Sequence, residues 1–212
     1  MEIFYLDSVD STHTYLKNYF KQNLYINPIC FYTFNQTAGI GSRDNTWDGK
    51  EGNLFFSFAV STDNLPKDLP LQSASIYFSY ILKLELEKLG SKLWLKWPND
   101  FYMDKHKFGG TITTLSKDIL LCGIGLNLKK VDDKYLGYLD IDIDTKKLLK
   151  NYFIHIEKYP SWKQIFSLFE VEFHKNKNFT TTINDQKTSL NQAVLCDDGS
   201  ILIDNKKVYS LR

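Results

Sequence analysis

The stretch Leu93-Trp94-Leu95-Lys96-Trp97-Pro98-Asn99-Asp100 decides how this 212-residue sequence is interpreted. It begins as a short apolar strand and ends in Pro-Asn-Asp, which breaks a strand and favours a turn. Asn99 and Asp100 therefore leave the end of a buried strand side by side. Lys107 then opens a second apolar run, so an acid, an amide and an amine can meet at one sheet edge, where binding groups are often mounted. Taken alone, the pattern is better explained as a plain β-hairpin with a charged tip.

A glycine-containing segment upstream adds weight to the binding interpretation. The residues Gly39-Ile40-Gly41-Ser42-Arg43 follow an expected strand at 29–34. Two glycines one residue apart let the backbone approach a ligand closely and present N–H groups to an anion. Arg43 adds a cationic fork suited to phosphate or carboxylate. By itself the segment favours a surface hairpin loop, because the third glycine of the dinucleotide fingerprint is missing and no helix follows.

A second glycine pattern lies downstream, in the expected strand 119–128. The residues Gly123-Ile124-Gly125-Leu126-Asn127 place glycine at alternate strand positions. One face of this strand then lacks side chains, so a flat ligand could lie there with Asn127 at its rim. A β-bulge or close helix packing explains the glycines about equally well.

Composition excludes several classes of function. The net charge of +1 gives no field that favours nucleic acid or an anionic membrane. No apolar run approaches the ~20 residues of a membrane span, and the acidic N-terminus lacks a signal-peptide pattern. Three scattered cysteines predict reduced thiols and a cytoplasmic protein. The four histidines show no metal or triad spacing, and most of them are expected to be ordinary surface or helix residues.

The remaining elements follow from periodicity and breakers. Strands are expected at 3–6, 53–60 and 108–115. Ser11 and Thr12 are expected to cap the first helix, with room for a second role in a pocket. Further helices are expected at 72–89, 146–157 and 162–174, and the small C-terminal strands at 179–183, 189–195, 201–203 and 207–211.

Together these features resemble the biotin protein ligases over nearly the full chain. The resemblance is carried by Asp10-Ser11-Thr12, Gln36-Thr37-Ala38-Gly39-Ile40-Gly41, Trp47, Lys96-Trp97-Pro98-Asn99-Asp100, Lys107 and Gly123-Ile124-Gly125-Leu126-Asn127. It implies an α+β fold: a mixed-sheet catalytic domain of the class II synthetase type at 1–176, and an SH3-like β-barrel at 177–212. It also implies that biotin and ATP form biotinyl-5′-AMP, which then acylates a lysine of a biotin carboxyl carrier domain.

The resemblance also implies roles for individual residues. Lys107, Arg43 and Asp100 would be catalytic, and Asp100 would hold Mg²⁺. Biotin would be bound by Ser11, Thr12, Gln36, Gly39, Lys107, Gly110, Gly123 and Gly125. The nucleotide would be bound by Gly39, Ile40, Gly41, Arg43, Trp47, Asn99, Asn127 and Arg212.

Some features depart from the family pattern or leave alternatives open. Ile40 and Ser42 stand where the family commonly has arginines, which weakens the expected charge of the glycine loop. A lipoate–protein ligase and a non-catalytic biotin or nucleotide sensor remain alternatives. The sequence starts at the catalytic strand, so we expect a short form without an N-terminal DNA-binding domain. Homodimers occur in the family, and the sequence leaves that state open.

Overall fold

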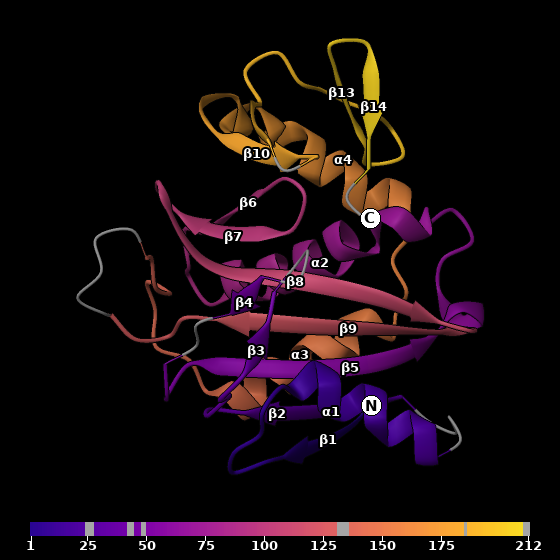
Figure 1. Ribbon diagram of the computed structural model, residues 1–212, viewed down its shortest axis with the longest axis vertical. Helices are drawn as coiled ribbons and strands as arrows, with labels where there is room; N and C mark the ends of the chain where they lie inside the picture. Colours follow the sequence, from indigo (N-terminus) through magenta and orange to yellow (C-terminus); the bar gives the residue numbers. More distant parts are fainter. Residues whose placement is uncertain (24–27, 42–44, 48–49, 131–135, 185, 210–212) are drawn as a thin grey trace.

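The computed structural model describes residues 1–23, 28–41, 45–47, 50–130, 136–184 and 186–209. Its centre is a seven-stranded sheet in the order β1-β2-β5-β9-β8-β7-β6 (Figure 1). The strands are β1 (Glu2–Tyr5), β2 (Ile29–Thr33), β5 (Leu54–Ser61), β9 (Ile119–Leu126), β8 (His106–Ser116), β7 (Asp100–Met103) and β6 (Trp94–Lys96). The β1–β2 pair is parallel and the other neighbours are antiparallel, so the predicted mixed sheet is confirmed.

Helices cover both faces of this sheet (Figure 1). Helix α1 (Thr12–Gln22) packs on one face through Leu16. Helices α2 (Ala74–Lys88) and α3 (Thr145–Ile156) pack on the other face, and α4 (Trp162–Glu172) lies against α2. Short 3₁₀ turns are η2 (Thr62–Asn64), η3 (Leu71–Ser73) and η4 (Phe173–Asn178). Among the described helices, none has both the length and the apolar character required to cross a bilayer.

Local sequence signals explain where these helices begin and end. Ser11 caps α1 by accepting from the Thr14 amide, and Ser161 forms a reciprocal capping box at α4. Helix α2 ends just before Gly90, whose φ of +101° suits glycine. Buried side chains surround α2 on nearly all sides, which makes it the central helix of the large core, as predicted.

The segment after the Trp-Pro-Asn-Asp turn contains one strand more than predicted. Strand β7 pairs with β6 on one side and with β8 on the other, so the chain makes a three-stranded meander before β9. The glycine loop also forms a small ladder, in which β3 (Gly39–Ile40) pairs with β4 (Thr46–Trp47). The described parts of that segment, residues 39–41 and 45–47, thus pair as the two arms of a hairpin.

The C-terminal region forms two small sheets, β10–β11 and β12–β13–β14. Their strands are β10 (Thr180–Ile183), β11 (Gln186–Ser189), β12 (Val194–Leu195), β13 (Ile201–Ile203) and β14 (Lys206–Val208). The single strand expected at 189–195 was wrong, because buried Leu190 and its hydrogen-bonded turn to Ala193 separate β11 from β12. The described strands form two separate sheets and no closed barrel.

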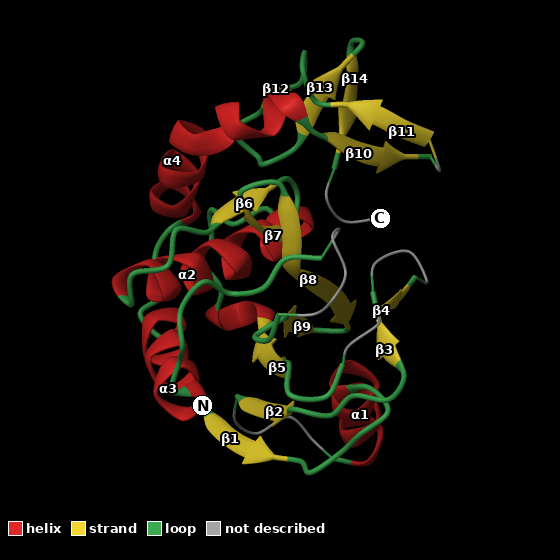
Figure 2. Ribbon diagram, turned by 90° about the vertical axis from the view of Figure 1, so that its left-hand side faces the viewer, coloured by secondary structure: helices red, strands yellow, loops and turns green. Residues whose placement is uncertain are grey.

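The C-terminal strands lie beside the end of α4 (Figure 2), and three successive carbonyls of one turn hold them on the larger part. Trp162 Nε1 donates to the Asp197 carbonyl at 2.7 Å, Ser73 Oγ to the Asp198 carbonyl at 2.5 Å and Trp97 Nε1 to the Gly199 carbonyl at 2.8 Å. Since the donors come from α4, η3 and the Trp-Pro-Asn-Asp turn, the C-terminal region contacts the same turn that carries Asn99 and Asp100.

Candidate active site

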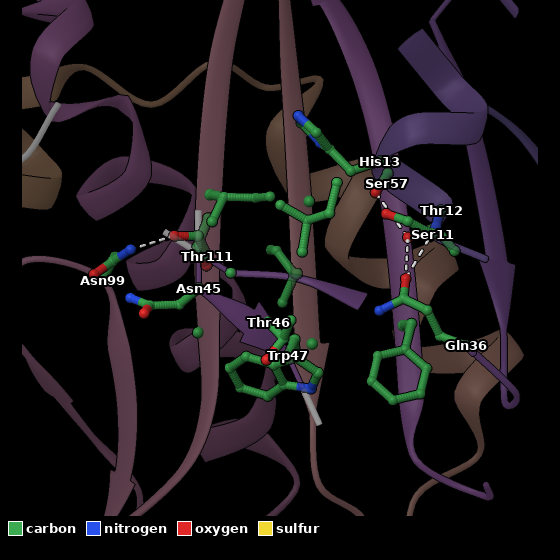
Figure 3. A pocket seen from close by; sticks show the side chains of 18 of the residues that line it. Ser11, Thr12, His13, Gln36, Asn45, Thr46, Trp47, Ser57, Asn99 and Thr111 are labelled. Atoms are coloured by element: carbon green, nitrogen blue, oxygen red, sulfur yellow. Dashed lines mark hydrogen bonds between the residues drawn. The ribbon is translucent and has the colours of Figure 1, made fainter. Parts of the chain in front are cut away.

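One pocket brings most of the predicted site residues together (Figure 3). It lies over strands β5, β9 and β8, beside the start of α1 and the β3–β4 ladder. The cavity has a volume of about 130 Å³ and is partly open to solvent. The predicted residues that line it are Ser11, Thr12, Gln36, Ile40, Gly41, Trp47, Asn99, Asp100, Lys107, Gly110, Gly123 and Gly125.

One end of the pocket is a buried polar cluster. The Thr12 amide donates to Gln36 Oε1 at 2.9 Å, and Thr12 Oγ1 lies 3.3 Å from the same oxygen. The Thr12 hydroxyl also lies 2.9 Å from Ser57 Oγ. Figure 3 shows these groups between α1 and β5. Ser11 acts as the helix cap while it lines the pocket, and Thr12 supplies a hydroxyl rather than a cap, so this end offers several donors and acceptors to a ring-shaped polar ligand.

Three glycines, Gly110 on β8 and Gly123 and Gly125 on β9, line the floor of the pocket. A Cβ atom on Gly123 would lie 3.0 Å from His13 Nδ1 and 3.1 Å from Ser57 Oγ. A Cβ on Gly125 would lie 3.1–3.3 Å from the Trp47 indole. The bare strand face is therefore already approached by side chains from above, and a larger residue at either position would displace them.

The other end of the pocket carries charge. Lys107 Nζ lies 2.6 Å from Asp100 Oδ1, and Lys96 Nζ lies 3.4 Å from Asp100 Oδ2. Burial alone would raise the pKa of Asp100, but the charges of Lys107 and Lys96 outweigh it and hold the pKa below its usual value. Two ammonium groups against one carboxylate leave one net positive charge, which suits an anionic ligand.

Lys107 and Asn99 are both held in defined directions. The Lys107 ammonium lies 5.4 Å from the centre of the Trp47 ring, so the indole restrains it in addition to Asp100. Asn99 Nδ2 donates to the Thr111 carbonyl on β8, and the Thr111 amide returns a hydrogen bond to the Asn99 carbonyl at 3.0 Å. The turn is thus fixed to the sheet on which the ligand would lie.

Two of the predicted residues that the structure describes, Gly39 and Asn127, are not among those that line the pocket. Gly39 lies behind it, where a Cβ would meet Gln36 Nε2 at 2.5 Å and the Trp47 carbonyl at 2.6 Å. Asn127 is buried and bonds Asn53 at 3.2 Å and the Gly137 carbonyl at 3.3 Å, which is a scaffold position in this structure. Arg43 and Arg212 lie outside the described residues.

The pocket also contains residues that the sequence analysis did not select. They are His13, Asn45, Thr46, Phe55, Ser57, Thr111, Ile112 and Ile124. The sequence does mark Ser57 as a candidate, because it is the polar residue inside the apolar run Leu54-Phe55-Phe56-Ser57-Phe58. His13 is a buried pocket residue rather than an ordinary surface histidine, and its sequence position after Ser11-Thr12 was the only hint.

Two buried polar atoms in the pocket point to a missing ligand. Within the described part of the chain, His13 Nδ1 and Trp47 Nε1 have no hydrogen-bond partner. Such atoms are costly to bury unpaired, and a bound ligand is one way to satisfy them. Protein ligands for a metal ion are few in this pocket, because the described residues contain no cluster of three or more His, Cys, Asp or Glu side chains. Any Mg²⁺ would therefore depend mainly on oxygens that its ligand brings, with Asp100 as a candidate protein ligand.

The fold and this site define a known class of protein. Residues 5–129 match the family model of the biotin/lipoate A/B protein ligases. The match covers more than half of the chain, and the chain belongs to that family.

Individual relatives point to the biotin branch of the family. A Helicobacter pylori biotin acetyl coenzyme A carboxylase synthetase, solved with bound biotinylated ATP, is 38% identical with a TM-score of 0.92, over 98% of this chain and 99% of that one. The biotin protein ligase of Aquifex aeolicus shares the fold, with 24% identity and a TM-score of 0.79 over 100% of this chain and 96% of that one.

Curated relatives match over a shorter stretch. Biotin–protein ligase 2 of Arabidopsis thaliana is 27% identical over 57% of this chain and 38% of its own length. The bifunctional ligase/repressor BirA of Escherichia coli is 27% identical over 62% of this chain and 43% of its own length. The matched region thus spans less than half of either relative.

Proposed function

We propose that this protein is a biotin–protein ligase, which activates biotin with ATP and transfers it to a lysine of a biotin carboxyl carrier domain. The observation that carries the proposal is the two-ended pocket. A buried hydroxyl and amide cluster lies at one end, the Lys107–Asp100 pair at the other, and a glycine floor joins them. Biotin has the matching shape: a polar ring, an apolar chain and a terminal carboxylate. The H. pylori relative, which is named for the same chemistry, supports the assignment.

Biotin would lie along the pocket with its ring at Ser11, Thr12 and Gln36 and its chain over the glycines of the floor, Gly110, Gly123 and Gly125. Its carboxylate would then reach Lys107. Carboxylate attack on the α-phosphate of ATP forms the mixed anhydride and releases pyrophosphate. The step needs charge neutralisation more than a base, because negative charge gathers on the phosphate oxygens. Lys107 would neutralise this charge.

The nucleotide would occupy the part of the pocket next to Trp47. Its phosphates would meet Asn99 and the loop that carries Ile40 and Gly41. Arg43, from the same loop, would add the guanidinium that holds phosphate. Mg²⁺ would arrive with the polyphosphate and retain several waters, and Asp100 would contribute one carboxylate. Gly39 and Asn127 stand behind the pocket and would support its wall. Arg212 is proposed as a nucleotide contact from the resemblance to the family.

We further propose the domain boundaries 1–176 and 177–212, with an SH3-like second domain. The turn at 197–199, which accepts hydrogen bonds from three donors of the larger part, supports a docked module rather than a free one. In the second half-reaction the ε-amine of the carrier lysine attacks the biotinyl carbonyl, an amide forms and AMP leaves. Thr180, Thr181 and Thr182 of the small domain line a second cavity, which shares Asn99, Asp100 and Lys107 with this pocket. The carrier would enter through that second cavity.

Pyrophosphate release tests the proposal directly. Purified protein is given ATP, Mg²⁺ and either biotin or lipoate, and a biotin carrier domain is then added as acceptor. Biotin-dependent pyrophosphate release followed by labelling of the carrier is the expected result. Release with lipoate instead would favour the lipoate ligase. Biotin binding without any release would favour the sensor.

A further inference from the structure

His13 is a buried residue of the pocket, and the proposed reaction gives it no role. It is the second residue of α1, and only 8% of its surface is exposed. Its Nε2 atom lies 3.1 Å from the Thr114 hydroxyl on β8, which fixes the ring plane. Its Nδ1 atom lies above Gly123, 3.0 Å from where a Cβ would be, and has no partner within the described residues.

The charge state of this ring limits what it can do. Burial, with a smaller contribution from the charge of Lys17, lowers the pKa of His13 to about 4. The imidazole is therefore neutral at physiological pH, with one donor and one acceptor nitrogen. Since Nε2 faces Thr114, the unsatisfied capacity for a hydrogen bond is on Nδ1, which faces the pocket floor.

The neighbours of Nδ1 indicate which part of a ligand it meets. Ser57 Oγ approaches the same vacant Gly123 position, at 3.1 Å, and bonds the Thr12 hydroxyl at 2.9 Å. His13 thus extends the polar cluster at the ring end of the pocket, away from the Lys107–Asp100 pair. Figure 3 shows His13 beside Ser57, above Thr12 and Gln36.

We propose that His13 is a specificity-determining residue, whose Nδ1 atom hydrogen-bonds the cyclic urea of the acid substrate. This inference rests on the proposed ligase function. A urea edge offers both N–H and C=O groups, so it satisfies Nδ1 in either tautomer of the ring. The dithiolane ring of lipoate offers neither and leaves Nδ1 buried and unpaired. A site with a dedicated polar partner rejects an analogue that lacks the group far better than an apolar pocket does.

Two substitutions separate this role from packing. His13→Phe keeps the ring volume and removes both nitrogens. His13→Asn places a polar side-chain atom at the same bond distance from Cα as Nδ1, but cannot reach Thr114. His174→Phe is the matched control, because His174 is exposed on η4 and bonds the Val171 carbonyl, remote from the pocket.

Calorimetry with biotin and with lipoate measures the effect. We expect His13→Phe to weaken biotin binding roughly 10-fold, in keeping with the loss of one buried hydrogen bond, and to strengthen lipoate binding, because the variant leaves no nitrogen unpaired against the dithiolane. His13→Asn should stay within about 3-fold of wild type, and His174→Phe should equal it. Unchanged biotin affinity in a folded His13→Phe protein would overturn the inference while the ligase function stands. A wild-type protein that binds no biotin would overturn both.

A second measurement on the wild type does not depend on the variant folding. With ¹⁵N-labelled histidine, the Nδ1 resonance of His13 should shift when biotin saturates the pocket, because that nitrogen gains a partner. The His174 resonances should not move. A His13 Nδ1 resonance that is unaffected by saturating biotin would also overturn the inference.

Discussion

The ammonium of Lys107 lies 2.6 Å from Oδ1 of Asp100, across the neighbouring strands β7 and β8. The lysine side chain is 39% exposed, while the side chain of Asp100, which holds it, is only 17% exposed. A lysine restrained by a partner loses less side-chain entropy when a ligand arrives. The pair therefore presents a positive charge whose position is set before substrate binds.

Removal of that charge should abolish activation of the acid. We expect Lys107→Ala to slow pyrophosphate release about 10²–10³-fold, the usual effect of one preorganised electrostatic group. Lys105→Ala is the control, because Lys105 is exposed in the β7–β8 turn just before Lys107. Near wild-type release from a folded Lys107→Ala protein would remove Lys107 from the mechanism.

Asp100 holds two lysines and is also the candidate metal ligand. Asp100→Asn should weaken MgATP binding or turnover about 10- to 100-fold, because a charge-assisted interaction is worth roughly 1.5–3 kcal/mol. Biotin binding should change less, since the ring end of the pocket is untouched. Calorimetry with each substrate measures both affinities. A fall in biotin affinity with MgATP affinity unchanged would contradict this division of the pocket.

Side chains added to the glycine floor should weaken ligand binding. In Gly123→Ala the new methyl group would stand 3.0–3.2 Å from His13 Nδ1, Ser57 Oγ and Ile112 Cγ1. Gly110→Ala is the milder comparison, because its methyl would meet Trp47, Asp100 and Lys107 at 3.4–3.6 Å, ordinary contact distances. We expect biotin affinity to fall at least about 10-fold in Gly123→Ala and less in Gly110→Ala. Equal losses in calorimetry would contradict this ranking.

The turn at 197–199, which docks the C-terminal region, should also be sensitive to an added side chain. Gly199 has a φ of +79°, and a Cβ there would lie 2.5 Å from Ser73 Oγ, one of the three docking donors. Gly90 has a φ of +101° but open space around it. We expect Gly199→Ala to lower the free energy of unfolding by about 2–4 kcal/mol and Gly90→Ala by about 1 kcal/mol. Urea denaturation compares the two variants. Equal losses of stability would show that backbone strain alone explains both, with no further cost from the contact with Ser73.

Acid should reveal the burial of His13. Its pKa lies at about 4 in the folded chain, against 6.5 when free. Between these values the unfolded chain binds a proton that the folded chain does not, so stability falls as the pH drops. Relative to His13→Asn, the wild type should lose up to about 3 kcal/mol between pH 7 and pH 4. Urea unfolding at several pH values measures it, and parallel pH profiles would contradict the expected burial effect.

Local patterns in the sequence were enough for most of the elements. The helix caps at Ser11 and Ser161, the glycine end of α2 and the alternating glycines of β9 act within a few residues of themselves. Period and breaker signals are likewise short-range, so strands and helices could be predicted where these signals are strong. Strand β7 was missed because a four-residue segment between two turns has too little pattern of its own.

What the sequence by itself determined is the set of chemical groups: the Ser-Thr pair, the glycine floor and the Asn-Asp-Lys constellation. Tertiary structure decided which of them face one pocket. In the folded chain Asn127 lies behind the floor and bonds Asn53, and Ser57 bonds Thr12. His13 packs over Gly123. Tertiary structure also split the C-terminal strand at Leu190. The physical reason is that burial and hydrogen-bond partners come from residues tens of positions apart, and only the assembled sheet with α1 packed on it brings those residues together.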